Sequence, residues 1–235
     1  MPPSSFEMSL FHAVNQFVGI SGLFDSIVNQ FAINNLVKNG LFIGLFWLAW
    51  FSRVSDQIKR YTDLCFVLSA VVISLFVNRA IATMMPFRPR PMFWTDIGFI
   101  KPNLGSTHLS LENFTSFPSD HAALYLALTT GFWFIARPIA VAMAIWSALC
   151  LLARIYLGLH FPGDIAGGAA IGIIVTLILR RHFILSGIRW MVEKIEQRAP
   201  ALFRTALVLF TFQLGVLFLD LRLLARGLFN RLPIP

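Results

Sequence analysis

The chain has 235 residues, of which 57% are hydrophobic and only 13% are charged. A soluble domain carries about a quarter charged residues, so a compact soluble fold could not bury this much apolar surface, and a lipid-facing exterior is predicted. The formal net charge of +8 does not indicate a nucleic-acid partner, because the basic residues stand at the ends of apolar runs; anionic lipid headgroups and phosphate substrates fit this charge better.

The N-terminal region is predicted to lie on the membrane surface. Between residues 6 and 30, apolar side chains such as Leu10, Phe11 and Val14 recur among polar ones at near-helical spacing. This pattern is typical of an amphipathic interfacial helix. A second interfacial segment is expected at residues 186–198, where Arg and Lys alternate with Ile, Trp, Met and Val.

Six apolar stretches follow the N-terminal region. Several of their uninterrupted cores are shorter than the ~18–20 residues that a spanning helix needs, and such a core also fits a buried helix of a soluble protein. Six runs in one small chain, each extendable with mildly polar flanks, nevertheless favour membrane spans. The predicted fold class is therefore all-α, an integral membrane bundle of six transmembrane helices with an N-terminal amphipathic interfacial helix. The stretches are 33–51, 64–85, 119–136, 138–156, 163–181 and 204–224.

We expect one membrane-embedded domain over residues 1–235, made of an interfacial segment (1–30), the six-helix bundle (31–224) and a tail (225–235). Within it, four glycines form two small-xxx-small pairs at the start of the fifth span. Small residues at this spacing let helix backbones approach closely, so we assign these glycines to helix packing and to no chemistry. They are Gly163, Gly167, Gly168 and Gly172.

The basic residues predict the orientation of the bundle. Six spans place ten Lys and Arg residues on one side and nine on the other. Four of the nine are set aside, because Arg88, Arg90 and Arg154 belong to the candidate site and Arg79 is expected within a helix. Ten against five then assigns the first group to the cytoplasm by the positive-inside rule. The ten are Arg53, Lys59, Arg60, Arg137, Arg180, Arg181, Arg189, Lys194, Arg198 and Arg204.

Three polar clusters are not explained by membrane insertion. One follows the second span, one opens the third span, and one runs from the end of the fourth span into the fifth. With six spans, all three fall on the same face of the membrane, the one assigned as extracytoplasmic, so we expect them to meet. They are Phe87-Arg88-Pro89-Arg90-Pro91, then Phe117-Pro118-Ser119-Asp120-His121, and then Arg154 with His160 and Asp164.

The first two clusters contain the groups that bind phosphate in proteins. The guanidinium group is a planar, permanently charged fork, so converging arginines form an anion clamp. Pro118 suits the first position of a helix, which places Ser119, Asp120 and His121 in its first turn. Free backbone N–H groups and the helix dipole make such a turn a phosphate site.

The third cluster contains a candidate nucleophile. Pro162 also suits a helix start, which leaves His160 just outside the helix and Asp164 in its first turn. A carboxylate that accepts a hydrogen bond from one imidazole nitrogen fixes the tautomer and leaves the other nitrogen free to attack. We therefore expect Asp164 to orient His160.

These residues resemble the type 2 phosphatidic acid phosphatase family, whose signature consists of a Lys-x6-Arg-Pro, a Pro-Ser-Gly-His and a Ser-Arg-x5-His-x3-Asp segment. The third segment matches at Arg154, His160 and Asp164, with Ala153 in place of Ser. The second matches with Asp120 in place of Gly, and this Pro-Ser-Asp-His form resembles the undecaprenyl-diphosphatase branch. Three motifs in order are highly specific, whereas one alone would be weak.

The first segment departs most from the family pattern. Aligning Arg90 with the motif arginine places Thr83 where Lys is expected. One phosphate-binding charge is then missing, and either Arg88 or Arg79, one turn before Thr83, could supply it. For Arg88 the sequence leaves contact with lipid headgroups open beside a role in the site.

The resemblance implies a role for each matched residue. His160 would be the nucleophile that forms a phosphohistidine, Asp164 would orient it, and His121 would be the general acid that protonates the leaving oxygen. Neither a metal nor another cofactor is expected, because arginine charges and a helix N-terminus stabilise the equatorial charge. The phosphate-binding residues would be Arg88, Arg90, Ser119, Asp120 and Arg154.

The predicted function is hydrolysis of undecaprenyl diphosphate to undecaprenyl phosphate, by a multi-pass protein of the bacterial inner membrane whose site faces the periplasm. Phosphatidic acid, phosphatidylglycerophosphate and lipid A are alternative substrates. A transporter that binds lipid phosphate without cleaving it is an alternative of another class, because charges within a membrane also mark transport paths. The sequence leaves the oligomeric state open.

Overall fold

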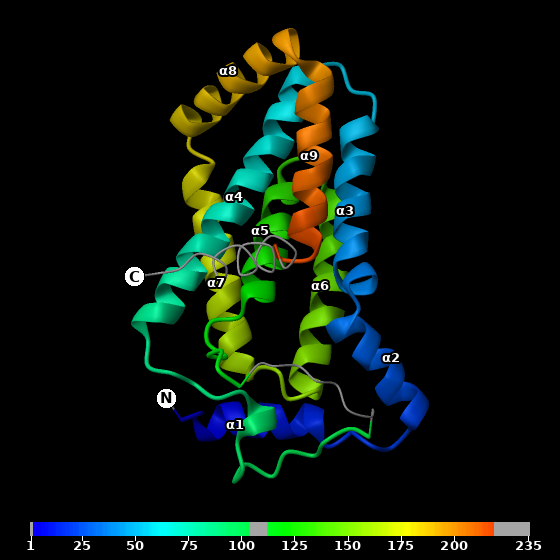
Figure 1. The fold of residues 1–235 in the computed structure, drawn as a ribbon, viewed down its shortest axis with the longest axis vertical. Helices are drawn as coiled ribbons and strands as arrows, with labels where there is room; N and C mark the ends of the chain where they lie inside the picture. Colours follow the sequence, from blue (N-terminus) through cyan, green and yellow to red (C-terminus); the bar gives the residue numbers. More distant parts are fainter. Residues whose placement is uncertain (1, 104–111, 219–235) are drawn as a thin grey trace, which may run out of the picture.

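The computed structural model describes residues 2–103 and 112–218, and every regular element in these ranges is a helix (Figure 1). The prediction of an all-α fold is confirmed. Most elements are long helices joined by short connections, with one 3-10 turn, η1, before the longest connection. In chain order they are α1 (Ser5–Asn15), α2 (Gly22–Ile33), α3 (Asn35–Phe51), α4 (Gln57–Met84), η1 (Pro91–Phe93), α5 (Asp120–Trp133), α6 (Arg137–Tyr156), α7 (Pro162–Leu179), α8 (His182–Arg198) and α9 (Pro200–Gly215).

Helix α5 forms the centre of the bundle and packs against α4, α6 and α7. The approach to α7 is close because both helices are lined with small residues. A Cβ atom on Gly168 would lie 2.3 Å from the Ser119 carbonyl oxygen, and one on Gly172 would lie 2.4 Å from that of Ala123. The assignment to helix packing is therefore confirmed for Gly168 and Gly172, whereas a Cβ atom on Gly163 would meet the Glu7 side chain and one on Gly167 the Phe117 ring.

The six predicted spans correspond to α3, α4, α5, α6, α7 and α9. By length and composition, α4, α6 and α7 can each cross a membrane, and α2 with α3 forms a fourth candidate bent by 53°. Helix α5 has 14 residues, about 21 Å at 1.5 Å per residue, which is less than the ~30 Å hydrocarbon core. Its neighbours surround it, so it does not have to face lipid along its length. The sixth predicted span and the tail continue beyond residue 218, outside the described residues.

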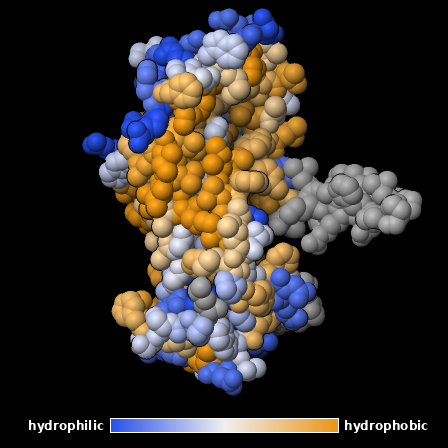
Figure 2. All heavy atoms as spheres, turned by 90° about the vertical axis from the view of Figure 1, so that its left-hand side faces the viewer, coloured by the Kyte–Doolittle hydropathy of each residue, from blue (hydrophilic) through white to orange (hydrophobic). Residues whose placement is uncertain are grey.

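The outer surface has the banding of a membrane protein. Figure 2 shows an apolar band at mid-height between two polar ends. Helices α4 and α7 lie on this side of the bundle, and their outward side chains are apolar. Phe76 is 74% exposed and Ile178 is 56% exposed, which is stable only against hydrocarbon.

The N-terminal segment forms two helices instead of one. Helix α1 lies across one end of the bundle, below α6 and α7 in Figure 1, and is the predicted interfacial helix. A turn separates the two helices, and in it Gly19 has a φ of +84°. Ser21 then caps α2 by accepting the Phe24 N–H. Buried Asp25 accepts the Gly19 N–H and the Tyr156 hydroxyl, which ties the break to α6.

The second interfacial segment is also helical. Helix α8 lies across the opposite end of the bundle from α1 (Figure 1). Its Phe183 and Trp190 are 86% and 63% exposed, while Arg189 pairs with Glu193 at 2.8 Å. An exposed aromatic face beside paired charges is typical of a helix at the headgroup level.

Candidate active site

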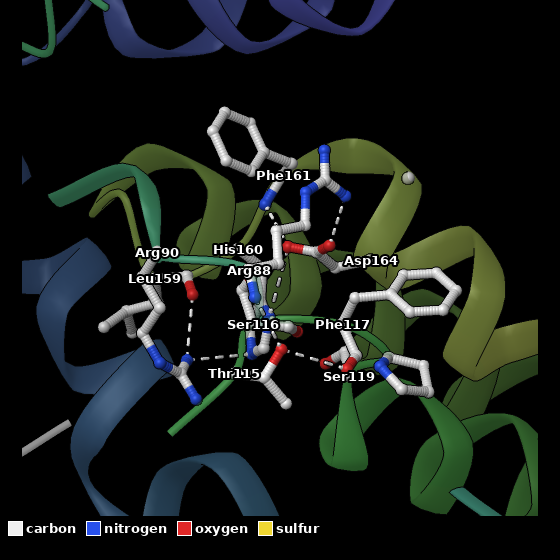
Figure 3. Close-up of polar contacts among 12 residues, drawn as sticks. Arg88, Arg90, Thr115, Ser116, Phe117, Ser119, Leu159, His160, Phe161 and Asp164 are labelled. Carbon is white, nitrogen blue, oxygen red and sulfur yellow. Dashed lines mark hydrogen bonds and ion pairs between the residues drawn. The ribbon is translucent and has the colours of Figure 1, made fainter. Parts of the chain in front are cut away.

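The three polar clusters meet at the end of the bundle that α1 covers. The segment between α4 and η1 supplies Arg88 and Arg90, the first turn of α5 supplies Ser119 and its neighbours, and the α6–α7 connection supplies His160. Figure 3 shows these side chains converging from different elements. The expectation that the clusters lie on one face of the membrane thus agrees with their positions.

His160 is held at both ring nitrogens. Its Nδ1 lies 2.9 Å from the Ser116 carbonyl oxygen, and its Nε2 lies 3.3 Å from Nη1 of Arg90. A carbonyl can only accept, so Nδ1 carries the proton and Nε2 presents a lone pair. Burial, together with the charges of Arg154 and Arg90, lowers the pKa of His160 to about 4 although Asp164 opposes the shift. The ring is therefore neutral and nucleophilic at physiological pH.

Asp164 supports this arrangement in a different way from the one predicted. Its Oδ2 is 3.7 Å from His160 Nδ1, too far for a good hydrogen bond. This oxygen instead accepts the Phe161 N–H at 2.7 Å, closing the turn that presents the histidine. The acceptor that fixes the tautomer is the carbonyl of Ser116, which motif spacing does not reveal because every residue has a carbonyl.

Arg88 has two carboxylate partners. Its Nη1 donates to Asp164 Oδ1 at 2.6 Å and its Nη2 donates to Glu7 Oε2 at 2.7 Å, while its guanidinium lies 4.6 Å from the centre of the Phe161 ring. Only 7% of Arg88 is exposed. Because the ends of its fork are occupied, this arrangement favours a role in holding the site over the predicted role in binding phosphate.

Arg90 remains placed to bind an anion. Its Nη1 donates to the Leu159 carbonyl at 2.8 Å and approaches His160 Nε2 (Figure 3). Its Nε is buried without a hydrogen-bond partner in the part of the chain that the structure describes. Burial and the nearby charge of Arg154 lower the pKa of Arg90 to about 10, which leaves the guanidinium charged at neutral pH.

Arg154 and His121 are buried like the other site residues. Arg154 is 7% exposed and donates from Nη1 to the Ala32 carbonyl at 3.1 Å. Arg154 Nε and His121 Nε2 are both buried and find no partner among the described residues. Lys38, in the first turn of α3, lies close enough for its charge to act on both side chains. It adds a cation that the motif analysis missed.

Ser119 is the N-cap of α5, because the helix begins at Asp120 and not at Pro118 as predicted. Its hydroxyl accepts the Ala122 N–H at 3.5 Å, and its own N–H donates to the Asp164 carbonyl at 3.0 Å. The starts of α5 and α7 are therefore joined directly. Two helix N-termini at one site give a positive potential that favours a phosphate group.

Asp120 is held by α4. It accepts a hydrogen bond from Asn78 at 2.7 Å and pairs with Arg79, so it brings the Arg79 charge to the start of α5. The Thr83 hydroxyl donates to the Ala80 carbonyl of its own helix. Of the two proposed substitutes for the missing lysine, Arg79 is thus the one directed toward the α5 motif.

Most candidate site residues lie together at one end of the bundle, and several residues that contact them were not predicted from the sequence. No group of three or more His, Cys, Asp and Glu side chains within residues 2–103 and 112–218 is arranged to hold a metal ion. The positive charges at this end of the bundle come mainly from arginines. Besides Lys38 and Ser116, the residues missed from the sequence are Glu7, Asn78 and Thr115, whose hydroxyl accepts the Arg88 N–H.

Comparisons with known proteins identify the family. Residues 63–186 match the PAP2 superfamily. Undecaprenyl-diphosphatase BcrC of Bacillus subtilis is 29% identical over 110 residues, which are 47% of this chain and 52% of that protein. Lipid A 4'-phosphatase of Porphyromonas gingivalis is 30% identical over 140 residues, 57% of this chain and 58% of that protein.

The chain thus spans about half the length of these curated relatives. The crystal structure of Aquifex aeolicus LpxE superposes with a TM-score of 0.53 at 23% identity, over 74% of this chain and 94% of that one. At this level of identity the superposition shows a common fold.

Proposed function

Since the chain belongs to the PAP2 superfamily, we propose that it is a membrane lipid phosphatase that hydrolyses undecaprenyl diphosphate to undecaprenyl phosphate through a phosphohistidine. The observation that carries the proposal is the state of His160. Its Nδ1 donates to Ser116, which leaves the Nε2 lone pair beside Arg90. A neutral imidazole protonated at Nδ1 carries its lone pair on Nε2, which can attack phosphorus once a phosphate oxygen takes over the Arg90 N–H.

The proposed reaction has two steps. In the first, the Nε2 lone pair of His160 forms a bond to the terminal phosphorus while the bond to the bridging oxygen breaks, and His121, protonated as an imidazolium when the anionic substrate binds, gives its proton to that oxygen. In the second, water attacks the phosphohistidine, its proton passes to His121, and the N–P bond breaks. Inorganic phosphate leaves and both histidines return to their starting state.

Fixed positive groups would stabilise the transition state. Phosphoryl transfer spreads charge over three equatorial oxygens, and preorganised donors aimed at them lower the barrier. Arg90 and Arg154 each have a buried Nε without a partner among the described residues. Together with the N–H groups at the start of α5, they form the proposed clamp.

The choice of a diphosphate rests on Asp120. This residue stands where the family usually has glycine and holds Arg79, whose side chain is 47% exposed. A second cation beside the α5 start would suit the second phosphate of a diphosphate. The match to the Bacillus undecaprenyl-diphosphatase supports this choice, and that to lipid A 4'-phosphatase supports the alternative of a lipid A substrate.

We further propose that the site faces the periplasm from the bacterial inner membrane. The basic residues assigned to the cytoplasm include Arg189, Lys194 and Arg198 of α8, which lies at the end opposite α1 (Figure 1). The positive-inside rule places that end in the cytoplasm. The α1 end, with the candidate site, is then extracytoplasmic.

Phosphate release by purified protein tests the function. We expect the wild type to hydrolyse undecaprenyl diphosphate faster than phosphatidic acid, phosphatidylglycerophosphate or lipid A. His160→Ala should abolish phosphate release while the protein stays folded, and His182→Ala, an exposed histidine of α8, should retain it.

Other outcomes separate the alternatives. Equal or faster release from the other lipids would contradict the diphosphate assignment. Full turnover by His160→Ala would exclude His160 as the nucleophile. Lipid binding without hydrolysis of any of the four lipids by the wild type would favour the transporter.

A further inference from the structure

Glu7, in the first turn of α1, reaches into the candidate site although it belongs to none of the three motifs. Its Oε1 accepts the Gly163 N–H at 2.9 Å, and its Oε2 accepts from Arg88 Nη2 at 2.7 Å. Only 13% of the Glu7 side chain is exposed. The interfacial helix thus sends one carboxylate to the start of α7 and to the motif arginine.

Arg88 connects Glu7 to both groups that surround His160 Nδ1. Its side chain donates to Asp164 Oδ1 at 2.6 Å. Its backbone carbonyl accepts the Ser116 N–H at 2.8 Å, and the carbonyl of that same Ser116 accepts from His160. A shift of Arg88 would therefore move the acceptor of His160 and the carboxylate behind it together.

Glu7 changes the net charge of the cluster that it forms with Arg88 and Asp164. Arg88 and Asp164 alone would form a neutral pair, whereas addition of Glu7 gives the cluster a net charge of −1. A histidine that bonds phosphorus through Nε2 while keeping its Nδ1 proton becomes an imidazolium. Because the cluster is buried, a net negative charge beside this ring is weakly screened and stabilises the intermediate.

From these contacts we propose that Glu7 is a positioning residue for phosphoryl transfer, an inference that rests on the proposed phosphatase function. It holds Arg88 and the first turn of α7, so that Ser116 and Asp164 keep His160 with its proton on Nδ1 and its lone pair on Nε2. It also supplies the negative charge that Arg88 would otherwise cancel at Asp164.

Helix α1 has separate means of attachment, which makes the role of Glu7 testable. Phe11 is fully buried, and its ring centre lies 5.6 Å from that of Phe161. Asn15 is also buried and donates to the Tyr156 carbonyl at 3.2 Å. These contacts remain when the Glu7 carboxylate is removed, so we expect Glu7 variants to fold with α1 in place.

The test compares Glu7→Ala and Glu7→Gln with Glu193→Gln, a control on exposed α8. For Glu7→Ala we expect kcat to fall between about 10-fold and 100-fold, as for misplacement of a reacting group by about 1 Å, with KM changed less than about twofold. Glu7→Gln keeps one acceptor for Gly163 but loses the charge, so its kcat should lie between those of Glu7→Ala and the wild type. The control should match the wild type.

A second measurement does not need turnover. In 15N-histidine NMR spectra, the wild-type His160 ring should show a single tautomer protonated at Nδ1, with the signal assigned by its loss in His160→Gln. In Glu7→Ala this signal should become a mixture of tautomers, while Glu193→Gln leaves it unchanged. A protein that hydrolyses no lipid phosphate would refute the proposed function, and the tautomer comparison would still decide the role of Glu7.

Three results would overturn the proposal. One is a Glu7→Ala variant with kcat within twofold of the wild type and an unchanged His160 tautomer. The other is a loss that appears only as a higher KM, which would make Glu7 a substrate-binding residue. A lower melting temperature with unchanged kcat would likewise restrict Glu7 to stability.

Discussion

Lowering the pH is the most direct perturbation of the candidate nucleophile. Burial, with the positive charges of Arg154 and Arg90, brings the pKa of His160 to about 4 from 6.5. The difference corresponds to about 3 kcal/mol against protonation in the folded protein. At pH 5 about 90% of the His160 rings would be neutral, whereas about 3% would be neutral if the pKa had its ordinary value of 6.5.

The lowered pKa of His160 can be measured by NMR of the ring and by the pH dependence of the kinetics. We expect the 15N signals of His160 to titrate with a midpoint near 4, and the acidic limb of kcat/KM, which reports the free enzyme, to follow it. Stability should change in the same window. Because the unfolded chain takes up the proton first, the contribution of neutral His160 is complete above about pH 6.5 and is lost as the pH falls toward 4.

A variant tests the cause of the shift. Arg90→Gln removes a positive charge near Nε2, so the midpoint of His160 should move upward, toward 6.5. Arg137→Gln, at the exposed start of α6, should leave it unchanged. A wild-type midpoint at or above 6, or no upward movement in Arg90→Gln, would refute the reasoning.

Two further predictions concern stability and are measured by thermal unfolding in detergent. Gly172→Ala should destabilise the bundle by about 1–3 kcal/mol, because its methyl group would meet the backbone of α5. The control Gly187→Ala, whose methyl group would have nothing within 4 Å, should stabilise the protein by up to about 1 kcal/mol. Equal effects of the two substitutions would contradict the packing argument. Asn39→Leu should cost about 2 kcal/mol, because it leaves the Tyr125 hydroxyl and the Gly215 carbonyl without their buried partner; an unchanged melting temperature would contradict this.

The architecture was largely predictable, because a membrane leaves few choices. Apolar runs in lipid must satisfy their backbone groups internally, so they become helices, and each predicted stretch has its helix. The break between α1 and α2 was missed, although Gly19 and the N-cap Ser21 are local signals for it. The length of α5 could not be predicted, since it depends on the neighbours that surround it.

The structure brings the predicted site residues together but gives several of them contacts that the sequence did not predict. Motif spacing brought His160 and Asp164 together, but it did not show which acceptor takes the Nδ1 proton. Asp164 is the third residue of a helix that begins at Pro162, a position from which a carboxylate caps its own helix. Its oxygen therefore serves the Phe161 N–H, and the carbonyl of Ser116 takes the place beside the ring.

The sequence also predicted more phosphate-binding arginines than the structure leaves available, for a related reason. A sequence shows which cations lie near a motif, but their free charge depends on partners that only the topology supplies. Glu7 is 81 residues from Arg88, and no local spacing rule joins an interfacial helix to a loop at that distance. With Glu7 and Asp164 on its fork, Arg88 is neutralised within the protein, so the buried charge left to meet a substrate comes from Arg90 and Arg154, beside the partly exposed Arg79 near the start of α5.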